Sequence, residues 1–195
     1  MEIAVIDYKG GNVQSVLFAL DRLGVAATLT ANHDAIQRAD KILFPGEGEA
    51  ASAMEELRAH GLDQLLPTLT QPFLGICLGM QLLGQHSEEN NADLLGILPF
   101  DVVRFPASVE YKVPHMGWNT LQNLQSPLFA GLREEDYVYF VHSYYAPVGE
   151  YTIAEATYPA PFSAAVQHQN FYAVQFHTEK SGPVGTRILE NFLKM

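Results

Sequence analysis

The sequence predicts an α/β domain built on a central, mostly parallel mixed sheet flanked by helices, with a strand-rich C-terminal half. In the first half, short apolar runs alternate with amphipathic runs of helical period, as in βαβ units. The apolar runs are near-continuous in Val, Ile, Leu and Phe, which is typical of parallel strands buried on both faces. At 195 residues, the chain fits one domain with a sizeable core.

The first half contains four expected strands and three expected helices. The opening strand is a continuous apolar run, and the helix after it ends at Gly24, the residue type that most often terminates a helix. The strands are expected at 2–7, 26–31, 41–45 and 72–76, and the helices at 13–24, 49–66 and 79–86. In the second helix, the periodicity predicts that Ala50, Met54, Leu57 and Leu62 face the core.

After residue 96 the pattern changes to short β-type runs broken by Pro, Gly and Asn. The last two runs predict a hairpin about Gln169-Asn170. A final helix is expected over 183–194, with Ile188, Leu189, Phe192 and Leu193 on one face. We expect these strands to continue the same sheet.

Composition excludes several classes of function. The formal net charge is −11 and no basic run offsets it, so nucleic-acid binding is excluded. A single cysteine excludes a disulfide framework and a Cys-rich zinc site. The N-terminus lacks a signal peptide and no 18 apolar residues run together, so a cytoplasmic protein without a membrane span is expected.

The single cysteine, Cys77, lies between Gly75 and Gly79 where a strand is expected to enter a helix. This G-x-C-x-G spacing matches a nucleophile elbow, a turn so tight that its flanking positions need glycine and its nucleophile is strained. A helix N-terminus favours thiolate, and the amide of Leu78 can serve as an oxyanion donor. The alternative is a small buried structural thiol.

His177 ends the apolar run "FYAVQFH" and is followed two residues later by Glu179. If the chain stays extended there, both side chains lie on one side, and the carboxylate can orient the imidazole as in a nucleophile–base–orienter triad. A zinc-deaminase site is excluded because no P-C-x-x-C accompanies the H-x-E, and no other cluster has metal-ligand spacing. No metal or cofactor is expected. Surface positions are expected for His33, His60 and His86.

Together, the motifs "DYKGGN", "FPGEGEA", "GICLGMQLL", "PHMGWN", "HSYYA" and "QFHTEKSG" resemble the class I (triad) glutamine amidotransferases. The resemblance runs in order from residue 2 to the C-terminal helix. It implies a single flavodoxin-like domain over 1–195. Within the family, the set is most similar to the glutaminase subunits that serve histidine biosynthesis.

The resemblance implies the following chemistry. Cys77 attacks the side-chain amide of glutamine, His177 protonates the departing ammonia and then activates water, and Glu179 orients the imidazole. The oxyanion is held by backbone amides at Glu47, Gly48 and Leu78. The residues implied in glutamine binding are Gly46, Gln81, His142, Ser143 and Tyr144.

The resemblance also implies a protein partner. Ammonia passes dry to a cyclase subunit with a (β/α)₈ barrel fold, with which the chain forms a heterodimer. The positions that match the family's interface are Asn12, Met116, Trp118, Tyr139 and Lys180.

Two positions depart from the family pattern. Glu47 replaces a small apolar residue, so that a carboxylate lies beside the oxyanion turn, and Thr178 replaces proline between His177 and Glu179. Three other hypotheses are a glutaminase subunit of another amidotransferase, a non-catalytic flavodoxin-like domain, and a cysteine hydrolase that needs no partner. Dependence of the activity on a partner distinguishes the glutaminase subunit from the cysteine hydrolase that needs no partner.

Overall fold

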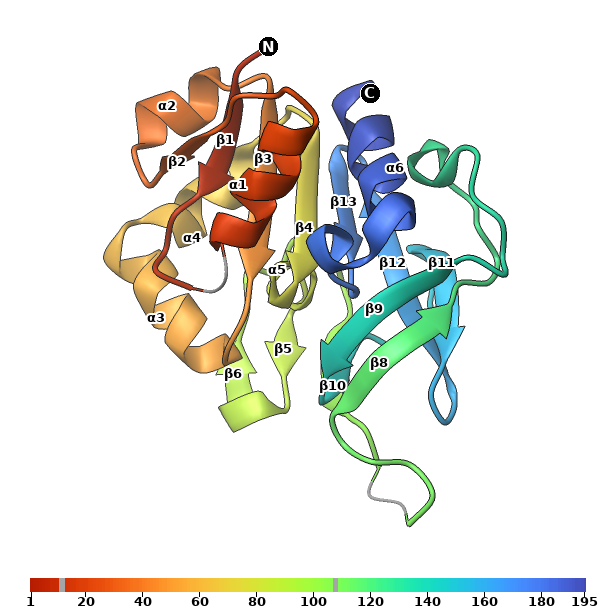
Figure 1. Cartoon of the computed structure of the whole chain (residues 1–195). Coiled ribbons are helices and arrows are strands. Elements are labelled where there is room, and N and C mark those ends of the chain that lie inside the picture. Colours follow the sequence, from red (N-terminus) through yellow and green to blue (C-terminus); the bar gives the residue numbers. More distant parts are fainter. Residues whose placement is uncertain (11–12, 107–108) are drawn as a thin grey trace.

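The computed structural model describes residues 1–10, 13–106 and 109–195 (Figure 1). A seven-stranded sheet forms its centre, in the order β11-β12-β13-β4-β3-β1-β2. The strands, in that spatial order, are β11 (Thr152–Thr157), β12 (Pro161–His168), β13 (Phe171–Val174), β4 (Phe73–Cys77), β3 (Lys41–Gly46), β1 (Ile3–Ile6) and β2 (Thr28–Thr30). The predicted mixed, mostly parallel sheet is confirmed.

The five strands from β13 to β2 are parallel, and β12 and β11 continue the sheet antiparallel. Parallel strands in the order 2-1-3-4-5 are the flavodoxin-like arrangement. The hairpin at Gln169-Asn170 joins β12 to β13 as predicted, with Gln169 at φ 52°. Because parallel strands present their carboxyl ends at one edge, the residues after β3, β4 and β13 meet there.

Helices cover both faces of the sheet, and strand alternation supplies two cores (Figure 1). Ile6 and Phe44 belong to the core beneath one set of helices, whereas Val5 and Leu43 belong to the other. The first set is α2 (His33–Arg38), α3 (Ala50–Ala59) and α4 (Leu62–Leu65); the second is α1 (Val13–Arg22) and α6 (Gly182–Leu193). None of the helices in the described residues is long and apolar enough to cross a membrane.

Two expected helices are shorter than predicted. The helix over 49–66 breaks at Gly61, whose φ of +65° is left-handed, and separates α3 from α4. The helix over 79–86 is only α5 (Leu78–Gln81). There the chain turns at Gly84, against which Phe100 packs, and the Gln85 amide donates to the Phe100 carbonyl at 2.9 Å.

The prediction that the second half simply continues the main sheet is wrong for 101–145. β8 (His115–Thr120) and β9 (Tyr137–His142) form a separate two-stranded ribbon, and Phe140 of β9 packs edge-to-face against Phe162 and Phe176 instead of pairing with an edge strand of the main sheet. A further four-stranded sheet contains, in spatial order, β10 (Tyr144–Tyr145), β7 (Asp101–Arg104), β5 (His86–Ser87) and β6 (Ala92–Asp93).

The turn between β4 and α5 depends on its glycines. A Cβ at Gly75 would lie 2.7 Å from the Gly79 carbonyl oxygen, and one at Gly79 would overlap the Phe44 carbonyl of β3. The close approach of backbone to backbone therefore requires glycine on each side of Cys77.

Replacing Gly79 with Ala should destabilise the fold by about 3 kcal/mol, because the added methyl meets backbone that cannot move aside. A urea unfolding curve measures the loss. The control is Gly149→Ala, whose methyl enters open space and should change stability by less than about 0.5 kcal/mol. Equal midpoints for the two variants would contradict the steric argument.

Candidate active site

A cavity of about 430 Å³ opens where β3, β4 and β13 end. The turn after β3 contributes Glu47, β4 contributes Cys77 at its last position, and the segment after β13 contributes His177. Its lining comprises Glu47, Gly48, Cys77, Leu78, Gln81, Glu89, Pro114, Val141, His142, Ser143, Tyr144, His177 and Lys180. The fold therefore brings most of the sequence-predicted site residues together around one cavity.

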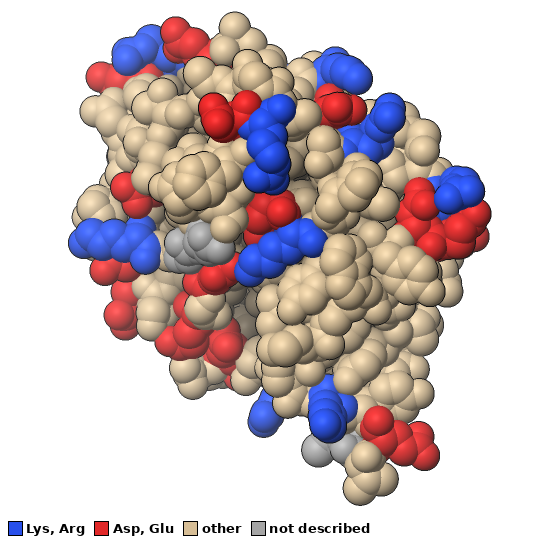
Figure 2. All heavy atoms as spheres, in the orientation of Figure 1, with Lys and Arg blue, Asp and Glu red and all other residues tan. Residues whose placement is uncertain are grey.

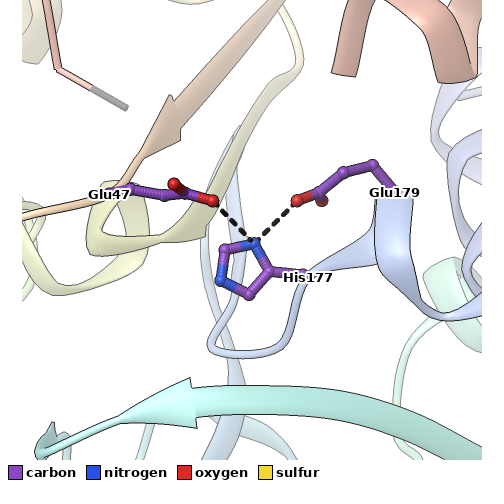
Figure 3. Close-up of side chains that lie close together, drawn as sticks. All are labelled: Glu47, His177 and Glu179. Carbon is purple, nitrogen blue, oxygen red and sulfur yellow. Dashed lines mark hydrogen bonds and ion pairs between the residues drawn. The ribbon is translucent and has the colours of Figure 1, made fainter. Parts of the chain in front are cut away.

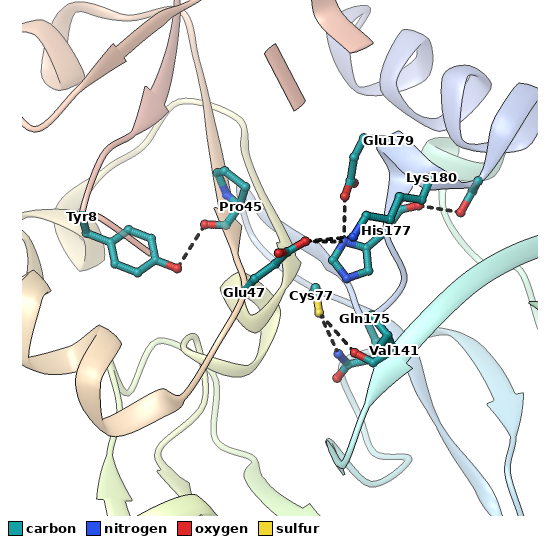
Figure 4. Close-up of polar contacts among 10 residues, drawn as sticks. Tyr8, Pro45, Glu47, Cys77, Val141, Gln175, His177, Glu179 and Lys180 are labelled. Carbon is teal, nitrogen blue, oxygen red and sulfur yellow. Dashed lines mark hydrogen bonds and ion pairs between the residues drawn. The ribbon is translucent and has the colours of Figure 1, made fainter. Parts of the chain in front are cut away.

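Cys77 has the strained backbone that its motif predicts, with φ 56° and ψ −112°. Its side chain is 7% exposed and faces the cavity. Two groups contact the sulfur at long range: the Val141 carbonyl oxygen at 4.0 Å and the Gln175 Nε2 at 3.9 Å (Figure 4). The thiol is thus buried but reachable from the cavity, as a nucleophile must be.

His177 and Glu179 form a buried pair, with 2.7 Å between Nδ1 and Oε1. The geometry differs from the expected extended strand, because Thr178–Lys180 is a 3₁₀ turn. The turn still brings the two side chains together. The backbone of His177 is held on both sides, since its amide donates to the Tyr139 carbonyl at 2.9 Å and its carbonyl accepts from Ser181 Oγ at 2.6 Å.

The electrostatics favour a charged imidazole. Burial alone would lower the pKa of His177, but the neighbouring Cys77 and the Glu179 carboxylate raise it to about 10. Because Glu179 engages Nδ1, Nε2 is the nitrogen left to exchange a proton, and it has no hydrogen-bond partner among the described residues. A partnerless donor in a reaction cavity suits proton transfer to a bound ligand.

Glu47 is a second carboxylate near the imidazole, with Oε1 3.9 Å from His177 Nδ1 (Figure 3). Its Oε1 also accepts from Lys180 Nζ at 2.9 Å, and this pairing helps raise the pKa of Lys180 against the burial that lowers it. The ammonium therefore offsets the charge of Glu47. The ligand atoms of Glu47, His177 and Glu179 lie within 4.8 Å of one another, but the Lys180 cation disfavours a metal ion there.

The end of β3, which leads into the turn at Glu47, is held by Tyr8. The Tyr8 hydroxyl donates to the Pro45 carbonyl at 3.1 Å, and burial raises the pKa of Tyr8. Gly46 is buried beneath the Tyr8 hydroxyl and Leu78 and does not line the cavity. Gly48 lines it, with a φ of +102°.

The part of the cavity lined by Gln81, His142 and Tyr144 contains hydrogen bonds that the sequence motifs did not predict. Gln81 Nε2 donates to the Tyr144 carbonyl at 2.9 Å and to Gln175 Oε1 at 3.0 Å. The same carbonyl lies 2.8 Å from His142 Nδ1, so that nitrogen carries the proton and Nε2 accepts from His115 Nδ1 at 3.1 Å. Burial lowers the pKa of His142 to about 3 and that of His115 to about 4, so the pair is neutral.

Glu89 is a further cavity residue that the sequence motifs did not indicate. Its Oε2 accepts from the Ala50 amide at 2.8 Å, at the start of α3, and burial raises its pKa. The polar run "SEENN" gives no sign that one of its acids turns inward. It adds a carboxylate to the lining of the cavity.

Three of the predicted interface residues, Met116, Trp118 and Tyr139, lie on the β8–β9 ribbon, which borders this cavity through Val141. Met116 is 63% and Trp118 54% exposed, and the Trp118 ring meets that of Tyr139 edge-on at 5.7 Å. Figure 2 shows that the surface over these two strands carries few charged side chains. Lys180 lies at the cavity wall, whereas Asn12 is outside the described residues.

Comparison with known proteins identifies similarity to glutamine amidotransferases along the whole chain. A family model described as glutamine amidotransferase class-I matches residues 4–195. The chain is 55% identical over 196 residues to the imidazole glycerol phosphate synthase subunit HisH of Bacteroides thetaiotaomicron, covering 100% of both chains. It is 46% identical over 197 residues to the subunit of the same name from Escherichia coli K12, again covering 100% of each.

Solved structures agree at the level of fold. A structure titled as a glutamine amidotransferase superposes with a TM-score of 0.75 at 20% identity, covering 98% of this chain and 97% of that one. PurLQS from Thermotoga maritima gives a TM-score of 0.72 at 15% identity, covering 99% and 97%.

Replacing Glu179 with Gln should move the pKa of His177 from about 10 toward its ordinary value of 6.5, because a charged partner is lost. Imidazole NMR signals followed against pH measure this change. A raised folded-state pKa contributes stability below pH 6.5 and loses it as pH rises through 10. The variant's deficit in unfolding free energy should therefore be larger at pH 6 than at pH 10.

The matched control is Glu190→Gln on α6, which removes a surface carboxylate paired with Arg187. It should leave the His177 titration unchanged. A His177 titration that is the same in wild type and in Glu179→Gln would show that the carboxylate does not govern this imidazole.

Proposed function

The chain belongs to the class-I glutamine amidotransferases, and we propose that it acts as the glutaminase subunit of an imidazole glycerol phosphate synthase in histidine biosynthesis. The observation that carries the proposal is that Cys77 and His177 line one cavity while Glu179 holds the His177 imidazole through Nδ1. The full-length similarity to subunits of that name supports the choice of reaction. The whole of 1–195 is proposed to be a single amidotransferase domain acting in the cytoplasm.

The proposed reaction begins at the thiol. The Cys77 sulfur attacks the side-chain amide carbon of glutamine, and the tetrahedral adduct collapses as His177 Nε2 gives its proton to the departing ammonia. The glutamyl thioester left on Cys77 is hydrolysed when His177 takes a proton from water. Glu179 fixes the imidazole through Nδ1 in both steps, so Nε2 faces the reacting atoms.

The developing oxyanion needs donors near the sulfur. We assign this role to the backbone amides of Leu78 and of Glu47 or Gly48, which follow the ends of β4 and β3. The Glu47 carboxylate would oppose a negative charge there, and its pairing with Lys180 reduces that opposition. Tyr8, holding the Pro45 carbonyl, supports the turn.

The cavity residues Gln81, Glu89 and His142–Tyr144 are proposed to bind the α-amino and α-carboxyl end of glutamine. Its α-ammonium suits the Glu89 carboxylate and the side-chain oxygen of Gln81. The polar groups proposed to hold the remaining backbone atoms belong to His142, Ser143 and Tyr144, and Gly46 is proposed to act through the shape of the turn. No cofactor takes part in these steps.

Ammonia must leave the cavity without meeting water, because water would protonate it. We propose that the partner is a cyclase subunit with a (β/α)₈ barrel, docked over the cavity as a heterodimer. Support comes from the ribbon face with exposed Met116 and Trp118 and half-buried Tyr139, which borders the cavity through Val141 on β9. Lys180 and Asn12 are the polar members of the proposed interface.

Purified wild-type chain should release little glutamate alone and much more when the cyclase subunit and its nucleotide ligand are added. The gain should vanish in Cys77→Ala, because no other residue can form the thioester. Glutamate assays measure both, and circular dichroism checks that the variant is folded. Vigorous turnover without a partner would support a free-standing hydrolase, and activity retained in Cys77→Ala would overturn the nucleophile assignment.

Trp118→Ala should weaken association with the cyclase subunit by about 2 kcal/mol, roughly thirtyfold, because a central exposed Trp is a typical interface hot spot. Isothermal titration calorimetry measures the affinity. Leu29→Ala on β2, an edge strand of the seven-stranded sheet and not part of the ribbon, removes another exposed apolar side chain and serves as the control. Equal affinities for the two variants would remove the ribbon from the proposed interface.

A further inference from the structure

We propose that Gln175 is a positioning residue of this site, whose side-chain amide connects Cys77 to Gln81 and holds a hydrogen-bond donor on the sulfur. It is the first residue of the motif "QFHTEKSG", which assigned it no role. Its role in turnover rests on the proposed function, whereas its effect on the thiol can be measured without glutamine or a partner.

Gln175 has no exposed surface and lies two residues before His177 in the segment that follows β13. Its backbone is fixed by a hydrogen bond from its amide to the Ala164 carbonyl at 2.8 Å. Its Oε1 lies 3.0 Å from Gln81 Nε2. Its Nε2 lies 3.9 Å from the Cys77 sulfur (Figure 4). A buried amide is costly unless it is satisfied, and these contacts engage both of its ends.

The direction of these hydrogen bonds is forced. The Tyr144 carbonyl can only accept, so Gln81 must turn its NH₂ toward it. That same NH₂ then faces Gln175, which must present its oxygen there. The NH₂ of Gln175 is therefore left facing the sulfur. A flip of either amide would set two donors or two acceptors against each other.

This arrangement matters because the sulfur lies between opposite influences. The Val141 carbonyl, 4.0 Å away, can accept from a thiol but repels a thiolate. The Gln175 donor favours the thiolate, since a hydrogen bond to the charged form stabilises it. Because the chain of bonds ends at Gln81, the same amide also fixes how that residue presents its oxygen to the cavity.

Other ionisable groups surround the sulfur and remain unchanged in the test. They are Tyr8 after β1, Glu47 after β3, Glu89 after β5, His142 on β9, and His177, Glu179 and Lys180 after β13. A change in thiol reactivity in Gln175→Met, which adds no ionisable group, is therefore assigned to loss of the amide.

The test uses two variants of the full chain. Gln175→Met removes both contacts, and Gln175→Glu keeps an acceptor for Gln81 but replaces the NH₂ by oxygen. The control is Gln167→Met on β12, whose amide oxygen accepts from Ser126 Oγ at 3.2 Å, away from the cavity. Thermal unfolding establishes that each variant is folded, and Gln175→Glu, the smaller change, serves if Gln175→Met does not fold.

The first readout is alkylation of Cys77 by iodoacetamide. At pH 7 the rate should fall about tenfold in both Gln175 variants, the effect of one hydrogen bond to a charged group, and recover at pH 10. Gln167→Met should react like wild type. Equal rates at pH 7 in folded wild type and both Gln175 variants would overturn the proposal, and so would a loss that persists at pH 10.

The second readout is steady-state glutaminase activity with the partner present. Both Gln175 variants should lose kcat, but only Gln175→Met should also raise the KM for glutamine, because only it releases the Gln81 amide. An unchanged KM in Gln175→Met would overturn the connection to Gln81. If alkylation changes as expected but no glutaminase activity is found even in wild type, the failure lies with the proposed reaction and not with Gln175.

Discussion

The site depends on one constraint, the tight turn that holds Cys77 at a positive φ between β4 and α5. The turn exists because Gly79 can lie against the Phe44 carbonyl of the neighbouring strand, where any side chain would collide. At this position the sulfur stands at the carboxyl edge of the parallel strands. The same edge receives the segment after β13, so the imidazole of His177 reaches the cavity without a long connecting loop.

Charge is distributed unusually around this turn. Two carboxylates, Glu179 and Glu47, approach the same imidazole nitrogen, and a single ammonium, Lys180, offsets one of them. Lys180 is also a proposed docking residue, so a partner that engages it would change the surroundings of Glu47 directly. Docking and the electrostatics of the cavity thus share one side chain, which gives a physical route for a partner to influence the chemistry.

The parallel core and the turn at Cys77 could be predicted from the sequence because their signals are local. These signals are apolar runs, helical periodicity and the spacing of glycines. It also indicated that His177 and Glu179 pair, but for the wrong geometric reason, since a 3₁₀ turn and not an extended strand joins them. Glu89, Gln175 and the His115–His142 pair could not be predicted, because each depends on contacts between distant segments. The separate β8–β9 ribbon was missed because alternation does not reveal which strand is the neighbour.

The most direct test of the account is to trap the intermediate. The chain in complex with its partner is mixed with glutamine, quenched in acid during turnover, digested and analysed by mass spectrometry. We expect a γ-glutamyl group attached through a thioester to the peptide that contains Cys77, and its loss on treatment with hydroxylamine. Continued release of glutamate during the reaction with no adduct on Cys77 would contradict the account.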